Sequence, residues 1–426
     1  MSARSRSRRD FLLGAAAAGA GLALASRTTA GDWTPAAAAA LSPLKPLGPS
    51  PPKIGAAERA ERRAALSRHL RDRGYAALVA GPGVHLEYLT GVGWGLSERL
   101  FVAILKPDAA PRFVCPAFER PTAAEKLESG WSTETWEEHE DPHALAARVI
   151  DPPRGGRVAA DPYLRFHPAQ RLGEALTSRA ARLDDGVELM RELRIVKSEA
   201  ELALIRHANH ITKAALRAAA AAVEPGMRQS QLAELVREAQ IRLGGAQPWA
   251  LVLFGPNAAF PHGTEQDRAL EPGDGILVDC GCGFEGYRSD VTRTWALGRP
   301  KGPLRRAWDA VRAAQQRAFE ALRPGLECEA ADRAARQVIE QSGFGTGYQR
   351  FTHRLGHGIG MEGHEDPYLV RGNRLPLRAG MTMSDEPGVY LPGELGVRLE
   401  DIVAITAEGA EYYGEVPTSL EQPFGP

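Results

Sequence analysis

Two pairs of similar segments repeat within the second half of the 426-residue chain. Residues 223–227 (VEPGM) resemble residues 322–326 (LRPGL), at an offset of 99 residues. Residues 270–274 (LEPGD) resemble residues 377–381 (LRAGM), at an offset of 107 residues. Two matches at similar offsets indicate a duplicated half-domain, in which each segment of the first half has a counterpart in the second. If the two halves face each other, side chains at equivalent positions should meet at a shared centre.

Acidic residues occupy equivalent positions in the two predicted halves. Asp279 and Glu386 each follow the leucine of the second repeated segment by nine residues. A second carboxylate, Asp290 or Glu400, follows a glycine-rich turn in each half. Paired carboxylates are costly to bury without a cation. Together with His357, these four residues are predicted to hold two divalent metal ions, and an oxygen-rich set favours Mn²⁺, with Zn²⁺ or Co²⁺ as alternatives.

The glycines after Asp279 allow a different interpretation. Gly281, Gly283 and Gly286 follow an apolar strand, as in a dinucleotide-binding fingerprint. That fingerprint requires a helix next, but residues 287–295 alternate and are rich in β-formers, so we predict a hairpin. The hairpin would present Asp279 and Asp290 on one face. Two metal ions held there could polarise a carbonyl and supply hydroxide at neutral pH, which is hydrolase chemistry.

Three histidines lie within residues 353–364, in a stretch rich in glycine. Glycines permit close backbone approach, so this stretch is typical of an active-site loop. His357 is the expected metal ligand, while His353 and His364 would lie beside the metals and hold the substrate. His262 lies in a turn-like Pro-His-Gly context, where a catalytic role and a turn role are equally consistent with the local sequence.

A basic residue closely precedes the last acidic ligand. Arg398 and Glu400 lie two apart on a predicted strand, so both side chains point to one face. Arg398 can therefore approach the metal site, where its planar guanidinium could bind a substrate carboxylate through two hydrogen bonds.

The first half of the chain predicts a separate, smaller α/β domain over residues 54–185. A helical pattern at residues 56–73 is followed by strand-like runs and further helices, including residues 76–80 and 142–150. The second domain is expected over residues 190–426. A formal net charge of −1 provides no global field for nucleic acid or a membrane surface.

The N-terminus carries an expected export signal. Arg8 and Arg9 precede a phenylalanine and two leucines, and an Ala/Gly-rich run follows at residues 14–25. We interpret residues 1–30 as a twin-arginine signal peptide and the protein as periplasmic or secreted, because the run is too short and too weakly apolar for a stable membrane span. Residues 31–53, rich in Ala and Pro, are expected to form a linker. The four cysteines are expected to be small buried residues rather than disulfide partners.

With these residues assembled, the region from about 190 to the end resembles the pita-bread metallopeptidases, which include methionine aminopeptidase, aminopeptidase P and prolidase. His262, His353, His364 and Arg398 match further active-site positions of that group. The region 54–185 more loosely resembles the creatinase/prolidase N-terminal domain, notably at residues 88–91 (YLTG). The five ligand motifs match in order: VDCG at 278–281, SDVTR at 289–293, GHGIG at 356–360, EPGVY at 386–390 and RLED at 398–401.

The resemblance implies an α/β (α+β) architecture, with a pita-bread catalytic domain of internal pseudo-two-fold symmetry behind the smaller domain. It implies a dinuclear-metal exopeptidase that hydrolyses Xaa-Pro bonds at peptide N-termini. Glu386 would act as general base and proton shuttle, and His262 and His364 would stabilise the transition state. His353 would pack near the proline ring. Relatives with this N-terminal domain commonly form homodimers, so a homodimer is expected.

Several alternatives remain open at this stage. A prolidase acts on Xaa-Pro dipeptides and an aminopeptidase P on longer peptides; we favour the dipeptidase, although the sequence does not show the length of the substrate pocket. A creatinase-like hydrolase and a non-catalytic pita-bread binding protein are the remote alternatives. Creatinase and the non-catalytic relatives lack the full metal set, whereas all five ligands are present here.

Overall fold

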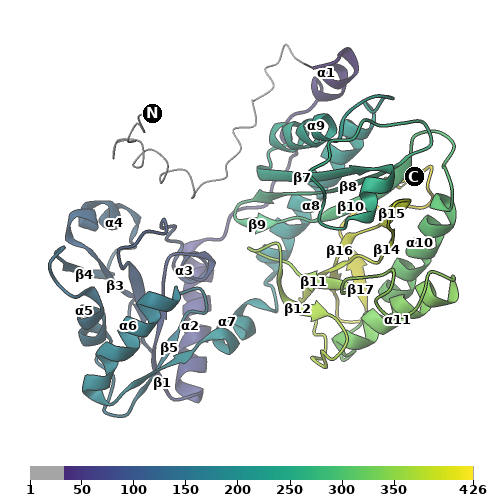
Figure 1. Ribbon diagram of the computed structural model, residues 1–426. Helices are drawn as coiled ribbons and strands as arrows, with labels where there is room; N and C mark the ends of the chain where they lie inside the picture. The colour runs from purple at the N-terminus through teal and green to yellow at the C-terminus, as the bar shows by residue number, and fades with distance from the viewer. Residues whose placement is uncertain (1–32, 426) are drawn as a thin grey trace, which may run out of the picture.

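The protein consists of two α/β domains that lie side by side (Figure 1). The computed structural model describes residues 33–425. The N-terminal domain spans residues 56–194 and the C-terminal domain residues 199–425. The predicted signal peptide, residues 1–30, lies outside the described residues. Within residues 33–425, no helix has both the length and the apolar content needed to cross a bilayer.

The N-terminal domain is a mixed sheet of six strands between two layers of helices. Its strand order is β4-β3-β2-β1-β5-β6. Apolar clusters fill both faces of the sheet, one under α2, α3, α4 and α7, the other under α5 and α6. The elements are α2 (Ala56–Asp72), β1 (Tyr75–Ala80), α3 (Val84–Thr90), β2 (Val102–Leu105), β3 (Arg112–Pro116), α4 (Arg120–Lys126), β4 (Ser132–Trp136), α5 (Pro142–Ile150), β5 (Arg157–Ala160), α6 (Phe166–Leu176), β6 (Arg182–Asp185) and α7 (Val187–Arg194).

The boundary between the domains lies a few residues later than the sequence predicts. The expected start of the second domain at residue 190 falls inside α7, whose Leu189, Met190 and Leu193 belong to the core of the N-terminal domain. The chain leaves that domain only at residues 195–198. There Ser198 begins α8 with a capping box, in which its hydroxyl accepts a hydrogen bond from the backbone N–H of Glu201 (3.2 Å).

The expected linker at residues 31–53 contains a packed helix. In α1 (Pro35–Leu41), the side chains of Ala37 and Leu41 are buried against α8 and α9 of the C-terminal domain. The Thr34 hydroxyl caps α1 by accepting a hydrogen bond from the N–H of Ala37 (3.2 Å). Alanine-rich sequence is compatible with both a linker and a helix. Here the apolar face of α1 packs against α8 and α9, which favours the helix. The described chain therefore begins on the C-terminal domain before it enters the N-terminal one (Figure 1).

The C-terminal domain has two similar halves. The first contains a sheet in the order β10-β8-β7 with β9 paired to β8, and the second a sheet in the order β12-β11-β13-β16-β17 with the hairpin β14-β15 beside it. The first half comprises α8 (Glu199–Ala220), α9 (Gln229–Arg242), β7 (Ala246–Phe254), β8 (Gly275–Phe284), β9 (Tyr287–Arg288) and β10 (Val291–Ala296). The second comprises α10 (Leu304–Ala321), α11 (Cys328–Gln341), β11 (Gly356–Gly358), β12 (Glu365–Leu369), β13 (Thr382–Asp385), β14 (Gly388–Leu391), β15 (Leu395–Arg398), β16 (Asp401–Ile405) and β17 (Ala410–Tyr412).

The repeated segments make the same contacts in both halves. The N–H of Gly226 donates to the carbonyl of Leu270 (2.8 Å), and the N–H of Gly325 donates to the carbonyl of Leu377 (2.8 Å). Both glycines have left-handed backbones, with φ of 85° and 84°, which glycine adopts at little cost. The first bond connects the turn before α9 to the turn before β8. The second connects the turn before α11 to the turn before β13. The duplication predicted from the sequence is thus present in the fold.

The two halves meet at a seam beside two predicted metal ligands. An isolated antiparallel bridge pairs Thr292, in β10, with Glu400, between β15 and β16. The N–H of Glu400 donates to the carbonyl of Thr292 (3.0 Å). The buried Arg293 donates to the carbonyl of Glu400 (2.8 Å) and to Asp401 Oδ1 (2.7 Å). These bonds fix the last acidic ligand against the first half.

Buried polar contacts hold the N-terminal domain against the C-terminal one. Arg62 of α2 donates to the hydroxyl of Tyr287 in β9 (3.0 Å). Arg194, at the end of α7, pairs with Glu362 (2.7 Å) and with Glu365. Such pairs add little net stability, because desolvation offsets attraction, but they restrict how two surfaces fit together. The contacts set the N-terminal domain beside β9 and the loop that follows β11.

Candidate metal centre and active site

The strands of both halves place the five predicted ligands. Asp279 lies in the middle of β8, opposite Thr292 of β10 in the hairpin register. Asp290 lies just before β10, two residues from Thr292 and therefore on the same face. The second half supplies His357 from β11, Glu386 directly after β13 and Glu400 between β15 and β16. Central strands fix the direction of their side chains, which makes the cluster rigid.

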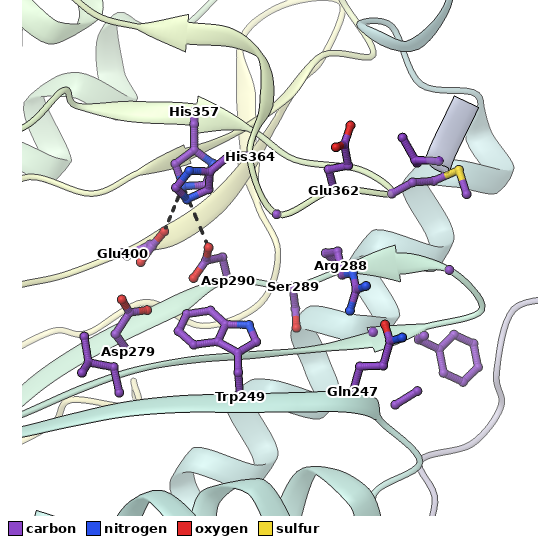
Figure 2. A pocket seen from close by; sticks show the side chains of 18 of the residues that line it. Gln247, Trp249, Asp279, Arg288, Ser289, Asp290, His357, Glu362, His364 and Glu400 are labelled. Carbon is purple, nitrogen blue, oxygen red and sulfur yellow. Dashed lines mark ion pairs between the residues drawn. The ribbon is translucent and has the colours of Figure 1, made fainter. Parts of the chain in front are cut away.

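The five side chains converge on one point. His357 Nε2 lies 3.2 Å from Glu386 Oε1, 3.9 Å from Asp290 Oδ2 and 4.0 Å from Glu400 Oε1; Figure 2 shows the last two contacts as dashed lines. Ligand atoms of His357, Glu386 and Glu400 all lie within 4.8 Å of one another. Those of Asp279, Asp290 and Glu400 form a second such group. The two groups share Glu400, so they describe two adjacent metal positions.

The electrostatics of the cluster require a compensating positive charge. Burial raises the pKa of Asp290 and of Glu400 well above the usual carboxyl range, and repulsion from the neighbouring carboxylates adds to the shift. Burial also acts to raise the pKa of Glu386, but the hydrogen bond with His357 and its positive charge lower it to about 2. Such a set either takes up protons or binds cations.

Unused acceptor atoms show that the cluster fits metal ions. Asp279 Oδ1 and Asp290 Oδ1 are buried without a hydrogen-bond donor in the described chain. The Nδ1 of His357 lies 3.1 Å from the carbonyl of Gly358, to which it can only donate. The lone pair of Nε2 then faces Glu386, and only a proton or a cation between them prevents repulsion. An imidazole and four carboxylates suit Mn²⁺, Zn²⁺ or Co²⁺.

Neighbouring hydroxyls orient the ligands. Thr292 donates from Oγ1 to Glu400 Oε2 (2.6 Å). Ser384 donates from Oγ to Glu386 Oε1 (3.1 Å) and accepts from the N–H of His357 (3.0 Å). Residues that orient metal ligands in this way typically matter for metal affinity.

Arg398 lies beside the cluster, as predicted, but its donors face protein groups. Its guanidinium donates to Asp279 Oδ2 (2.5 Å), to the hydroxyl of Tyr390 (2.9 Å) and to Thr292 Oγ1 (3.1 Å). In this arrangement Arg398 holds one of the carboxylate ligands. The binding of a substrate carboxylate by Arg398 stays a prediction.

The three other predicted histidines all border the cluster. His353 Nε2 lies 2.8 Å from the hydroxyl of Tyr390, and burial lowers the pKa of His353 to about 4. The ring of His364 lies 3.8 Å from that of His357, and burial together with the charge of His357 lowers the pKa of His364 to about 4. His262, on the loop after β7, lines the same cavity. The structure thus brings together every site residue predicted from the sequence.

The cluster opens into a cavity of about 1560 Å³. Both halves of the C-terminal domain line this cavity, and so does the N-terminal domain through α3 and the loop after it, including Glu87 and Trp94. Trp249 of β7 is 37% exposed and forms an apolar wall next to Asp279 (Figure 2). A rigid cluster of metal ligands at the end of such a cavity is typical of a metal-dependent hydrolase.

Several residues in or next to this cavity carry little signal in the sequence. Tyr390 is buried behind the cavity wall, where its hydroxyl contacts both His353 and Arg398. Its place four residues after Glu386 on a strand edge was the only available signal. Trp249 and Glu87 had no signal, because an isolated aromatic or acidic residue is far more often structural.

Comparison with known proteins agrees with this site. Residues 203–407 match the metallopeptidase family M24, and residues 62–196 match the creatinase/prolidase N-terminal domain. The probable dipeptidase PepE of Mycobacterium tuberculosis is 35% identical over 367 residues, which cover 85% of this chain and 96% of that protein. The Xaa-Pro dipeptidase of Lactobacillus helveticus is 32% identical over 355 residues, covering 81% of this chain and 94% of that protein. The crystal structure of dipeptidase PepE from Mycobacterium ulcerans has a TM-score of 0.81 at 34% identity, covering 86% of this chain and 98% of that chain.

The chain therefore belongs to the metallopeptidase family M24. It is a metal-dependent peptidase, in which the C-terminal domain has the pita-bread fold and the smaller domain is of the creatinase/prolidase type. Both features agree with the expectations from the sequence.

Proposed function

We propose that the protein is an Xaa-Pro dipeptidase that uses two divalent metal ions. The convergence of all five ligands with His262, His353 and His364 in one cavity carries the proposal. The names of the relatives, dipeptidase PepE and Xaa-Pro dipeptidase, support the same substrate class.

The residues around the cluster can perform each part of the hydrolysis. Bound metal ions would polarise the scissile carbonyl and lower the pKa of the attacking water. Glu386, whose Oε1 lies 3.2 Å from His357 Nε2 at the edge of the cavity, would accept the proton of that water and pass it to the leaving amine. His262 and His364 line the cavity that contains the cluster and would stabilise the charge that develops on the carbonyl oxygen. His353 lines the cavity and would pack near the proline ring, while the buried Tyr390 contacts its Nε2.

Removal of a single ligand tests the assignment. Asp290→Ala and His357→Ala should abolish metal-dependent cleavage of Ala-Pro, because each removes a donor shared by the cluster. His139→Ala, at an exposed position of the N-terminal domain, is the matched control and should retain full activity. Circular dichroism and thermal melting establish that the variants fold. Near wild-type turnover by either ligand variant would contradict the proposal.

Aminopeptidase P activity is the second candidate, and the size of the cavity favours it. A volume of about 1560 Å³ exceeds the space that a dipeptide needs. Comparing kcat/KM for Ala-Pro and Ala-Pro-Ala distinguishes the two: a dipeptidase cleaves only the first at an appreciable rate.

We further propose Mn²⁺ as the metal that supports activity best. The prevalence of carboxylates in the ligand set supports this choice over Zn²⁺. Chelator-treated protein reloaded with Mn²⁺, Co²⁺ or Zn²⁺ should recover the highest kcat with Mn²⁺. Elemental analysis of the purified protein should find close to two ions per chain, whereas a binding module without a metal site would retain none. A creatine assay tests the remaining remote alternative and should show no turnover.

Export and assembly are also proposals. The Arg8-Arg9 pair supports twin-arginine export to the periplasm or medium, and Arg8→Lys with Arg9→Lys should retain the protein in the cytoplasm. The resemblance to creatinase/prolidase proteins supports a homodimer, in which the N-terminal domain of one subunit borders the cavity of its partner. Light scattering coupled to gel filtration should give a mass near twice 45.9 kDa for the full chain, less the signal peptide.

A further inference from the structure

Two arginines that line the cavity, Arg288 and Arg354, have no acidic partner among residues 33–425, and of these two only Arg354 lies over an aromatic ring. Arg288 of β9 is half-buried and lines the cavity. Among residues 33–425, no carboxylate oxygen lies within 4.0 Å of its guanidinium. The other arginines that line the cavity are engaged: Arg398 pairs with Asp279, and Arg354 lies over the ring of Tyr368 at 4.3 Å. A half-buried guanidinium without a counter-ion, facing a substrate cavity, is suited to an anionic ligand group.

Arg288 lies well away from the Asp279 end of the cavity. Arg288 pairs with Gly283 in the β8-β9 register, whereas Asp279 pairs with Thr292 in the β8-β10 register. Four residues of β8 separate the two positions, which corresponds to about 13 Å along the strand. Figure 2 shows Arg288 and Gln247 at one end of the row of labelled residues and Asp279 at the other.

Backbone contacts around Arg288 limit the positions that its guanidinium can occupy. Its N–H donates to the carbonyl of Gly360 (2.8 Å), which ties β9 to the segment after β11. Its Nη1 lies over Gly283, where an added Cβ would come within 3.3 Å. The absent side chain at Gly283 therefore leaves room beside β8 for the guanidinium of Arg288, and both residues line the cavity.

The two ends of the cavity would hold different parts of the substrate. His353, the residue expected near the proline ring, is linked through Tyr390 and Arg398 to the Asp279 end. With the scissile carbonyl at the metal cluster, the residue before proline extends in the opposite direction, past Asp290 toward Arg288. The side chain of that residue would then approach the unpaired guanidinium.

We propose that Arg288 is a specificity-determining residue that binds an acidic side chain at the position before the scissile bond. The inference rests on the proposed dipeptidase function and deepens it by naming the preferred class of substrate. A carboxylate accepts two parallel hydrogen bonds from a guanidinium, whereas the amide of glutamine, of equal size, offers one acceptor and no charge. Glu-Pro should therefore be preferred to Gln-Pro, and the shorter Asp-Pro should benefit less.

The test compares matched dipeptides on the metal-loaded, full-length mature protein. The wild-type ratio of kcat/KM for Glu-Pro over Gln-Pro should be roughly 10 to 100, the range expected for a charge-assisted hydrogen-bonded pair. In Arg288→Gln the ratio should fall to near one while Ala-Pro turnover stays unchanged, and Arg288→Glu should favour Lys-Pro. Arg317→Gln, which removes the same charge from an exposed position of α10, should keep the wild-type ratio.

Each other outcome overturns the proposal in a recognisable way. An unchanged Glu-Pro to Gln-Pro ratio in Arg288→Gln excludes recognition of the side chain. A uniform rise of KM for all dipeptides, Ala-Pro included, would mean that Arg288 binds a group common to every substrate. An equal effect of Glu87→Gln would mean that Arg288 pairs with Glu87 of α3, which lines the same cavity. Glu-Ala and Gln-Ala are measured in the same way. If these two dipeptides are cleaved but Xaa-Pro dipeptides are not, the proposed proline preference is wrong, and the ratio of kcat/KM for Glu-Ala over Gln-Ala still tests Arg288. If a folded, metal-loaded protein cleaves neither, both proposals fail.

Discussion

Replacing Thr292 by valine should weaken metal binding without disturbing the fold. The Thr292 hydroxyl donates to Glu400 Oε2 at 2.6 Å and accepts from Arg398 Nε at 3.1 Å, inside a fully buried strand. Valine has the same branched shape, so Thr292→Val removes these two bonds and little else. A hydrogen bond to a charged group contributes about 1.5–3 kcal/mol. The bond also helps to keep Glu400 ionised, against the burial that raises its pKa.

The expected consequence is a metal dissociation constant about 10- to 100-fold higher than that of the wild type, since about 1.4 kcal/mol corresponds to a factor of ten. Calorimetric titration of Mn²⁺ into chelator-treated protein measures it directly, and kcat at saturating Mn²⁺ should recover most of its wild-type value. Thr382→Val is the matched control: its hydroxyl is equally buried but donates to the carbonyl of Ile359 (2.6 Å), not to a ligand. The reasoning is refuted if the folded Thr292→Val variant binds Mn²⁺ within about twofold of the wild type, or if Thr382→Val loses as much affinity.

Three further predictions concern the fold. Glu365→Gln should destabilise the protein at pH 7 by about 3–5 kcal/mol, because Lys197 loses its buried partner and Arg194 loses one of its two. Although burial opposes it, these two cations lower the pKa of Glu365. The stabilisation is therefore present above pH 4.5 and is lost as the pH falls through the folded-state pKa. Urea denaturation at a series of pH values should show that the difference in free energy of unfolding between wild type and variant shrinks in acid. Leu277→Ala should cost about 2–5 kcal/mol in the same assay, since Leu277 is 0% exposed in β8. All four cysteines are buried free thiols, as the sequence predicts, so a thiol reagent should label none in the native protein and four after unfolding.

The convergence of the five predicted metal ligands could be inferred from the sequence because their positions follow from short-range patterns. A strand ending in an acidic residue, followed by a hairpin with a second acidic residue, is visible within a few neighbouring residues. The duplication then supplied the long-range relation, namely that Asp279 and Asp290 meet Glu386 and Glu400. The structure confirms this relation through the bridge between Thr292 and Glu400.

The contacts of Arg398 and the packing of α1 could not be predicted in the same way. Strand alternation places the Arg398 side chain on the correct face, but its pairing with Asp279 depends on the distance between β15 and β8, which only the complete fold determines. The Ala/Pro-rich composition of residues 31–53 does not reveal α1. This short helix packs on α8 and α9, and only the complete fold brings those surfaces together. The start of the second domain was misplaced for a related reason: an apolar stripe such as that of α7 shows that a helix is buried, but not in which domain.

Because the predicted ligands lie on both sides of the seam between the two halves of the C-terminal domain, bound metal ions would link one half to the other. The first half contributes two carboxylates and the second half three ligands, and Glu400 reaches across the bridge to Thr292. If these five residues are the ligands, a nascent chain with only its first half folded has two of them, and we expect metal ions to bind tightly only after the second half has docked. Metal occupancy would then report that the chain has finished folding. A pathway that transports only folded proteins would export the protein with its metal ions bound, whereas a pathway that transports unfolded chains would export it without them.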